Sequence, residues 1–168
     1  MIEMSNWQES LKNRSIASLQ SLRERFGEEH FPQIDRLQAA VDNFEFRISP
    51  AMVDLIQEPG DPIWQQYVPT MSELDIQDGI VDSLNEDADS PVPNITHRYP
   101  DRALFLVSPV CASYCRFCTR RRKVGDPEKI PMSQFESAFK YLEEHTEIRD
   151  VIMSGGDPLM LGDRRLET

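Results

Sequence analysis

Residues 103–118 read ALFLVSPVCASYCRFC, and this stretch decides the fold. Its first part, Ala103–Val107, is a short apolar run without polar alternation, which is typical of a strand buried on both faces. Its second part places Cys111, Cys115 and Cys118 within eight residues, directly after that strand. Sites of α/β proteins lie at the carboxyl ends of their parallel strands. The stretch therefore predicts a buried strand that carries a site built from thiols.

A helix and a second strand are predicted after the cysteines. Ser133 and Glu136 match a capping box at the start of a helix. Residues 150–153 (DVIM) are again strand-like, and the glycine-rich residues 154–158 (SGGDP) follow them. The order of strand, loop, helix and strand predicts a parallel βαβ unit. Because two parallel strands under one helix cannot bury both of their faces, we expect the chain to be a fragment of a longer protein.

The first hundred residues indicate helical and extended structure. Apolar residues recur at near-helical spacing over residues 11–26 and 34–44, and Gly27 fits the end of the first helix. Ser49 followed by Pro50 predicts a third, short helix over residues 50–57. Six prolines between residues 58 and 100 disfavour long regular elements there. We therefore expect an α/β protein with a helical and extended region, 1–100, followed by an α/β region, 101–168.

The charge is uneven along the chain. The sequence has 18 Lys and Arg against 29 Asp and Glu, which gives a net charge of −11. Residues 1–100 contain 7 of the basic and 18 of the acidic side chains, so the remainder is balanced, with 11 of each. This acidity disfavours nucleic acid or an anionic membrane as a partner. One cationic run stands at residues 120–123 (RRRK), where Arg121, Arg122 and Lys123 are expected to pair with acidic side chains.

The three cysteines are the strongest chemical signal. An odd number in one short loop is a poor disulfide framework and indicates reduced thiols. With no apolar run of about 18 residues and no secretory pattern at the start, a cytoplasmic protein without a membrane span is expected. A structural zinc site closes four ligands and would need His97 or His145 as well. A [4Fe–4S] cluster on three cysteines keeps one iron open for a substrate or cofactor, and we favour it over zinc and over incidental thiols.

The spacing C-x3-C-x2-C, with the aromatic Phe117 before the last cysteine, resembles the radical S-adenosylmethionine (SAM) enzymes. Three segments narrow the resemblance to the lysine 2,3-aminomutase family: residues 90–102 (SPVPNITHRYPDR), 111–122 (CASYCRFCTRRR) and 151–159 (VIMSGGDPL). The resemblance implies a partial (β/α)6 radical SAM barrel, of which this chain would contain the helical N-terminal region and only the first βα units. It also implies three cofactors, namely a [4Fe–4S] cluster, SAM and pyridoxal 5′-phosphate (PLP).

The resemblance assigns roles to individual residues. The cluster ligands would be Cys111, Cys115 and Cys118. SAM would be bound by Ser154, Gly155, Gly156 and Asp157, and by Phe117, which stands where lysine aminomutases place His. The PLP pocket would be lined by Arg98, Tyr99 and Arg102, since Arg suits a phosphate. Arg120 would hold the substrate α-carboxylate in a bidentate fork. The family's PLP-binding lysine matches no position of this chain.

The implied activity moves an amino group from the α- to the β-carbon of a free amino acid, with lysine, glutamate or arginine as candidates. An electron donor such as flavodoxin or ferredoxin, and a homo-oligomeric full-length protein, are expected with it. Two alternatives stay open: a lysine 2,3-aminomutase that modifies a translation elongation factor, and a non-catalytic iron–sulfur protein. Because the active site would be incomplete, we expect the 168 residues alone not to catalyse amino migration.

Overall fold

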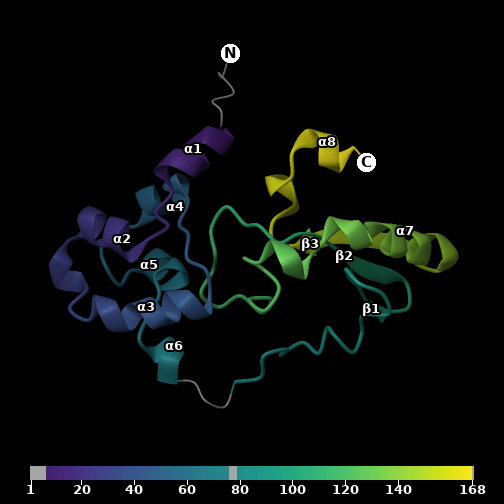
Figure 1. Cartoon of the computed structure of the whole chain (residues 1–168), viewed down its shortest axis with the longest axis horizontal. Coiled ribbons are helices and arrows are strands. Elements are labelled where there is room, and N and C mark those ends of the chain that lie inside the picture. Colours follow the sequence, from purple (N-terminus) through teal and green to yellow (C-terminus); the bar gives the residue numbers. More distant parts are fainter. Residues whose placement is uncertain (1–6, 76–78, 168) are drawn as a thin grey trace. The chain divides into compact units, whose positions relative to one another are not determined.

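The computed structural model describes residues 7–75 and 79–167 of the chain (Figure 1). The chain divides into two compact units. The N-terminal unit combines Met1–Gly79 with Ala112–Cys118, and the C-terminal unit combines Ile80–Cys111 with Thr119–Thr168. Most of the cysteine loop therefore belongs to the helical unit, although it follows a strand of the other unit. No helix within the described ranges is long and apolar enough to cross a membrane.

The N-terminal unit consists of short helices around an apolar core. They are α1 (Trp7–Arg14), α2 (Leu19–Phe26), the 3-10 helix η1 (Glu28–His30), α3 (Ile34–Asn43), α4 (Pro50–Leu55), α5 (Pro62–Tyr67) and α6 (Ser72–Asp75). The single helix expected over residues 11–26 is wrong, because Ile16 forms a backbone bridge with Ile48 between α1 and α2. The buried Leu22, Phe46 and Ile48 lie in the core. The short helix at Pro50 and the end of α2 at Gly27 are confirmed.

Proline and a capping carboxylate explain why α5 starts where it does. Pro62 occupies the first helical position, where the missing N–H costs no helical hydrogen bond. The Oδ1 atom of Asp61 accepts a hydrogen bond from the backbone N–H of Trp64 at 2.7 Å. The Trp64 ring then packs edge-on against Phe26, with 5.1 Å between the ring centroids. The proline-rich stretch thus contains short helices that pack into the N-terminal core.

The C-terminal unit is built on a three-stranded sheet in the order β1-β2-β3. Strand β1 (Ile95–Tyr99) pairs antiparallel with β2 (Arg102–Ser108), and β2 pairs parallel with β3 (Asp150–Gly155). Helix α7 (Phe135–Glu144) connects the parallel strands and packs on the sheet through the buried Ala138 (Figure 1). The expected parallel βαβ unit is confirmed. The remaining helices are short, namely η2 (Pro127–Lys129), η3 (Met132–Gln134), η4 (Pro158–Met160) and α8 (Asp163–Leu166).

One local expectation for this unit is wrong, and one strand was not predicted. Strand β1 lies in the segment expected to be extended, and it joins the sheet through a tight turn after Tyr99. The capping box of Ser133 does not form, because Ser133 lies in the 3-10 helix η3 and α7 begins only at Phe135, without a side-chain cap. Phe135, the first residue of α7, packs on the sheet, with 5.0 Å between its ring centroid and that of Phe105 of β2.

Candidate functional site

The cysteine loop is fixed to the N-terminal unit by the arginine inside the motif. The Arg116 side chain is only 8% exposed and forms an ion pair with Glu73, with 2.8 Å between Nη2 and Oε2. Its guanidinium also donates to the backbone carbonyls of Ala40, Phe44 and Glu45 at 3.1–3.2 Å. A buried guanidinium needs such partners, because it cannot lose its charge. The loop conformation is therefore specified by contacts to three backbone carbonyls of one segment, residues 40–45, and to one carboxylate.

The thiols of the motif are reduced and half-buried. None of Cys111, Cys115 and Cys118 forms a disulfide. The backbone N–H of Cys118 donates to the carbonyl of Cys115 at 3.1 Å, so these two cysteines bracket one tight turn. Among the described residues, no group of three or more His, Cys, Asp or Glu side chains is arranged to hold a metal ion. The donor chemistry of three cysteines outside any disulfide nevertheless fits an iron–sulfur cluster.

Two aromatic residues of the loop behave differently. Tyr114 is buried and packs edge-on against Phe44 of the helical unit, with 5.9 Å between the centroids. Phe117, the predicted SAM-binding residue, is 66% exposed. An aromatic ring that packed as core would be covered, so Phe117 is the loop side chain whose surface remains for a ligand. A third aromatic residue of this unit, Tyr67, lies close to the loop. The pKa of its hydroxyl is raised, mainly by burial and secondly by the nearby Cys115.

The glycine-rich segment is attached to the residues that precede Cys111. The backbone N–H of Gly156 donates to the carbonyl of Ser108 at 2.5 Å, and that of Asp157 donates to Val110 at 2.9 Å. Gly155 has a φ of +105°, and a Cβ atom there would overlap the Ser108 carbonyl oxygen. Two backbones can approach this closely only where side chains are missing. The glycines predicted to bind SAM therefore also allow close contact with the end of β2, which leads into the cysteine loop.

The predicted PLP and substrate residues meet in one cavity of the C-terminal unit. Arg98, Tyr99, Arg102 and Arg120 all line this cavity, whose volume is about 290 Å³. Ile152 of β3 and the carboxylates of Glu86 and Asp89 complete part of its wall. Three arginines around one small cavity favour an anionic ligand. The structure therefore brings together, from separate segments, the residues that the sequence predicted for two ligands.

The arginines of the cavity are oriented by neighbouring groups. Arg98 donates from Nη1 to the Leu84 carbonyl at 3.0 Å. Arg102 donates from Nε and Nη2 to the two carboxylate oxygens of Asp101, at 3.1 and 3.3 Å. These hydrogen bonds, and next those from Arg149, lower the pKa of Asp101 from 3.8 to about 2. Asp101 therefore stays ionised at neutral pH and holds Arg102.

The cationic run pairs with an acidic turn that the sequence reasoning did not connect to it. Arg122 contacts Asp82 and Asp87, at 2.8 and 3.2 Å, and Lys123 contacts Asp87 at 2.9 Å. Arg120 contacts Glu86. The ion pairs expected for Arg122 and Lys123 are confirmed. The signal that could have revealed the pairing is the match of an acidic run, residues 82–89, to the only cationic run of the sequence.

His97 and His145, the alternative zinc ligands, gather around one tyrosine. The Nδ1 atom of His97 lies 2.7 Å from the Tyr141 hydroxyl, and Nδ1 of His145 lies 2.8 Å from the Tyr141 carbonyl oxygen. The His145 ring also stacks on the Tyr141 ring with 3.8 Å between the centroids. These contacts give both imidazoles a packing role on α7.

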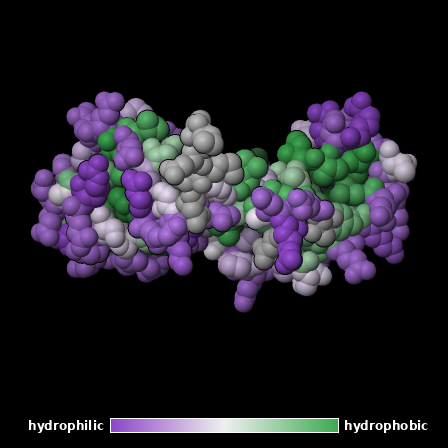
Figure 2. All heavy atoms as spheres, turned by 90° about the horizontal axis from the view of Figure 1, so that it is seen from above, coloured by the Kyte–Doolittle hydropathy of each residue, from purple (hydrophilic) through white to green (hydrophobic). Residues whose placement is uncertain are grey.

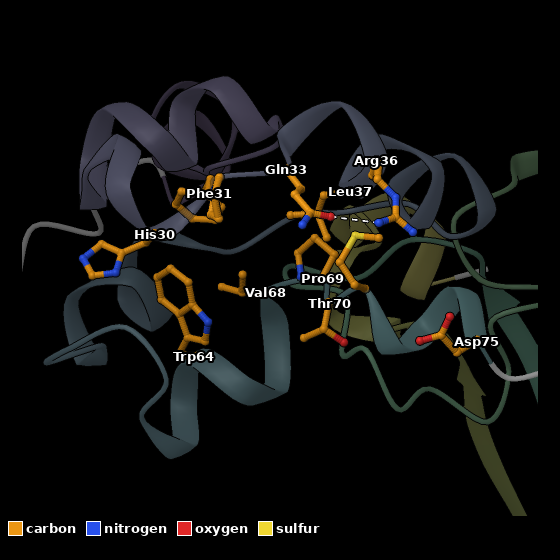
Figure 3. A pocket seen from close by; sticks show the side chains of 12 residues that line it. His30, Phe31, Gln33, Arg36, Leu37, Trp64, Val68, Pro69, Thr70 and Asp75 are labelled. Carbon is orange, nitrogen blue, oxygen red and sulfur yellow. Dashed lines mark hydrogen bonds between the residues drawn. The ribbon is translucent and has the colours of Figure 1, made fainter.

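A second and larger hollow lies in the N-terminal unit, with a volume of about 500 Å³ (Figure 3). Trp64 and Phe31 form an aromatic wall, and Arg36 donates to the Gln33 side chain at 2.9 Å (Figure 3). None of the residues predicted to bind a cofactor or substrate lines it. The smaller cavity is therefore the one in which geometry and predicted chemistry coincide.

Comparison with known proteins defines the class first. Residues 105–168 match the radical SAM superfamily. The matched range contains most of β2, all three cysteines, and β3 with its glycine-rich end. The chain is thus a radical SAM protein, in agreement with the spacing of its cysteines.

Individual relatives identify the family within this superfamily. The L-lysine 2,3-aminomutase of Fusobacterium nucleatum is 36% identical over 170 residues, covering 99% of this chain and 40% of that protein. That of Bacillus subtilis is 48% identical over 111 residues, covering 65% of this chain and 24% of the relative. The glutamate 2,3-aminomutase of Clostridioides difficile is 39% identical over 127 residues, covering 74% and 30%. The chain belongs to the lysine 2,3-aminomutase family and spans at most 40% of the length of these three relatives.

Proposed function

We propose that the protein containing this chain is a radical SAM, PLP-dependent 2,3-aminomutase, an isomerase that moves the amino group of lysine, glutamate or arginine from the α- to the β-carbon. When bound, the cluster and SAM supply the radical, and PLP carries the migrating nitrogen. The residues of this chain bind and orient these groups. Membership of the family and the cavity with three arginines support this proposal.

The proposed ligand sets are those that the family resemblance implies. Cys111, Cys115 and Cys118 hold the cluster, and the ion pair of Arg116 with Glu73 fixes the loop that carries two of them. Phe117 and residues 154–157 bind SAM. Arg98, Tyr99 and Arg102 bind PLP, with Arg102 held for the phosphate by Asp101. A guanidinium that is already oriented loses less conformational entropy when it binds an anion.

Arg120 carries the proposal, because its contacts leave a fork for a carboxylate. A guanidinium has five N–H donors. Nε and Nη2 contact Glu86 Oε1, at 2.8 and 2.7 Å, and Nη1 donates to Ser154 Oγ at 3.1 Å. These three contacts leave at least one N–H on each terminal nitrogen. Such a pair is the donor geometry that binds a carboxylate bidentately, and a bound α-carboxylate would fix the position of the substrate α-carbon.

We further propose that β2 and β3 are the first two parallel strands of a (β/α)6 barrel. The parallel register of β2 and β3, with α7 as the connecting helix, supports this. A low-potential carrier such as flavodoxin or ferredoxin would then deliver the electron that the cluster needs. The full-length protein is proposed to be a cytoplasmic homo-oligomer.

The test uses the full-length protein, reconstituted without oxygen with iron, sulfide and PLP, then reduced and given SAM. Lysine, glutamate and arginine are supplied separately, and β-amino acids are measured by chromatography with mass spectrometry. At least one β-amino acid is expected. In Arg120→Lys the bidentate fork is lost, so kcat/KM should fall about 10- to 100-fold. Arg14→Lys, on the exposed surface of α1, is the matched control and should retain the wild-type kcat/KM.

The result that would overturn the proposal is a correctly loaded wild-type protein that forms no β-amino acid from any of the three substrates. An unchanged cluster signal on addition of SAM would point to the non-catalytic iron–sulfur protein. Turnover only on a lysine residue of a translation elongation factor would favour the second alternative.

A further inference from the structure

Among the described residues of the C-terminal unit, Glu86 has the most deeply buried carboxylate. It is 4% exposed and lies in the acidic turn that precedes β1. Its Oε1 atom accepts a hydrogen bond from Nε of Arg120 at 2.8 Å and lies 2.7 Å from Nη2 of the same guanidinium. Such a side-on, charge-assisted contact fixes the plane of a guanidinium as well as its position. Burying a carboxylate is costly unless it is paired, and the ion pair with Arg120 offsets this cost for Glu86.

The contact determines which donors of Arg120 remain available. Glu86 occupies the side of the guanidinium formed by Nε and Nη2, and Ser154 of β3 accepts from Nη1 at 3.1 Å. Both partners and Arg120 belong to the C-terminal unit. Glu86 and Arg120 both line the 290 Å³ cavity, so the clamp is part of the cavity wall.

A second arginine lies next to Glu86, and the backbone of Glu86 is held as well. The Oε2 atom of Glu86 makes no hydrogen bond to a described residue, and Nη2 of Arg122 lies 3.8 Å away from it. Arg122 is in turn paired with Asp82 and Asp87. The backbone N–H of Glu86 donates to Oδ1 of Asp82 at 3.0 Å. Glu86 is thus fixed from its backbone and from its carboxylate, as a group that orients another side chain must be.

We propose that Glu86 is a positioning residue that clamps Arg120 so that its remaining N–H pair faces the substrate carboxylate. This inference rests on the proposed role of Arg120. It assigns a function to an acidic turn, residues 82–89, to which the sequence pattern alone assigns no role. Glu86 itself does not contact the substrate carboxylate, because like charges repel.

The positioning role and simple electrostatics predict opposite results for Glu86→Gln. The substitution keeps the shape of the side chain but removes a negative charge beside Arg120. On electrostatics alone, a substrate carboxylate would then bind more tightly. If Glu86 positions Arg120, binding weakens, because the neutral amide is the poorer acceptor and the guanidinium gains alternative orientations.

The experiment measures KM, kcat and the substrate dissociation constant for the full-length protein and three variants. In Glu86→Gln we expect KM and the dissociation constant to rise about tenfold, with kcat changed less than threefold. Glu86→Asp keeps the charge and should restore part of the affinity. Glu143→Gln, an exposed residue of α7, is the matched control and should behave as wild type.

A double variant tests whether Glu86 acts through Arg120. In the Arg120→Lys background, Glu86→Gln should change KM less than twofold, because the fork it orients is already lost. Circular dichroism at each step confirms that the variants are folded, and Glu86→Asp replaces any Glu86→Gln protein that is not. Tighter or unchanged substrate binding in Glu86→Gln, or fully additive effects in the double variant, would overturn the inference. A wild type without aminomutase turnover would instead reject the proposed function.

Discussion

At the scale of single residues, Asp101 links a PLP-pocket arginine to the pH dependence of stability. Hydrogen bonds from Arg102 and Arg149 lower its pKa from 3.8 to about 2 in the folded chain. A carboxyl whose pKa is lower in the folded state stabilises that state above its unfolded pKa. This contribution is therefore complete above about pH 4 and is lost as the pH falls toward about 2.

The prediction concerns the difference between wild type and Asp101→Asn in urea unfolding. The wild type should be more stable at pH 6, and the difference should shrink progressively between pH 4 and pH 2.5. Arg149→Gln removes one hydrogen-bond donor to Asp101. In the Arg149→Gln background, Asp101→Asn should therefore cost less stability at pH 6 than it does in the wild type. A difference that is constant across this pH range would show that Asp101 titrates normally.

Residue types indicated the chemistry of the site, but they did not reveal which charges pair. Arg98, Tyr99, Arg102 and Arg120 were predicted from motifs, and all four line one cavity. Arg116 is an unspecified position of the C-x3-C-x2-C pattern, yet its side chain is a buried anchor. Its partners are Glu73 and backbone carbonyls around residues 40–45, and no local pattern encodes contacts over more than 40 residues.

At the scale of elements, the junction between β3 and the strand end before the cysteines depends on Gly155. Alanine there would adopt an unfavourable positive φ, and its Cβ would overlap the backbone carbonyl of Ser108. We expect Gly155→Ala to reduce the free energy of unfolding by about 2 to 4 kcal/mol. Gly162→Ala is the matched control, because no described atom beyond its two chain neighbours lies within 4 Å of the added methyl group and its φ is −73°.

Urea unfolding of both variants checks this prediction. Gly162→Ala should remain within about 0.5 kcal/mol of wild type. If the two alanine variants had equal stability, the close contact between residues 108 and 155 would not contribute to the fold.

Periodicity predicted elements best where local and tertiary preferences agree. The apolar run at residues 103–107 and the strand-like run at 150–153 lie within β2 and β3. The predicted continuous helix over residues 11–26 failed, because pairing of Ile16 with Ile48 interrupts it. Strand β1 was missed for a similar reason, since its register with β2 is a tertiary contact that the prolines around it conceal.

At the scale of the whole molecule, the C-terminal unit presents an apolar face that its described residues leave exposed. Figure 2 shows hydrophobic atoms, in green, gathered on this unit. A groove of about 590 Å³ runs between α7 and β3, and Val151 and Met153 in it are 43% and 49% exposed. An apolar patch of this kind is typical of an interaction surface. In the proposed full-length protein, further barrel units would cover it.

We therefore expect the 168-residue chain to bind the dye anilinonaphthalene sulfonate, and the full-length protein to bind less of it per mole. Val151→Thr and Met153→Thr should each lower the dye fluorescence of the short chain, because threonine keeps the strand preference while reducing the apolar surface. Ile80→Thr is the matched control, since Ile80 is exposed but does not line the groove, and it should change the fluorescence little. Equal fluorescence from the short and full-length proteins would contradict the proposal that further barrel strands pack on this face.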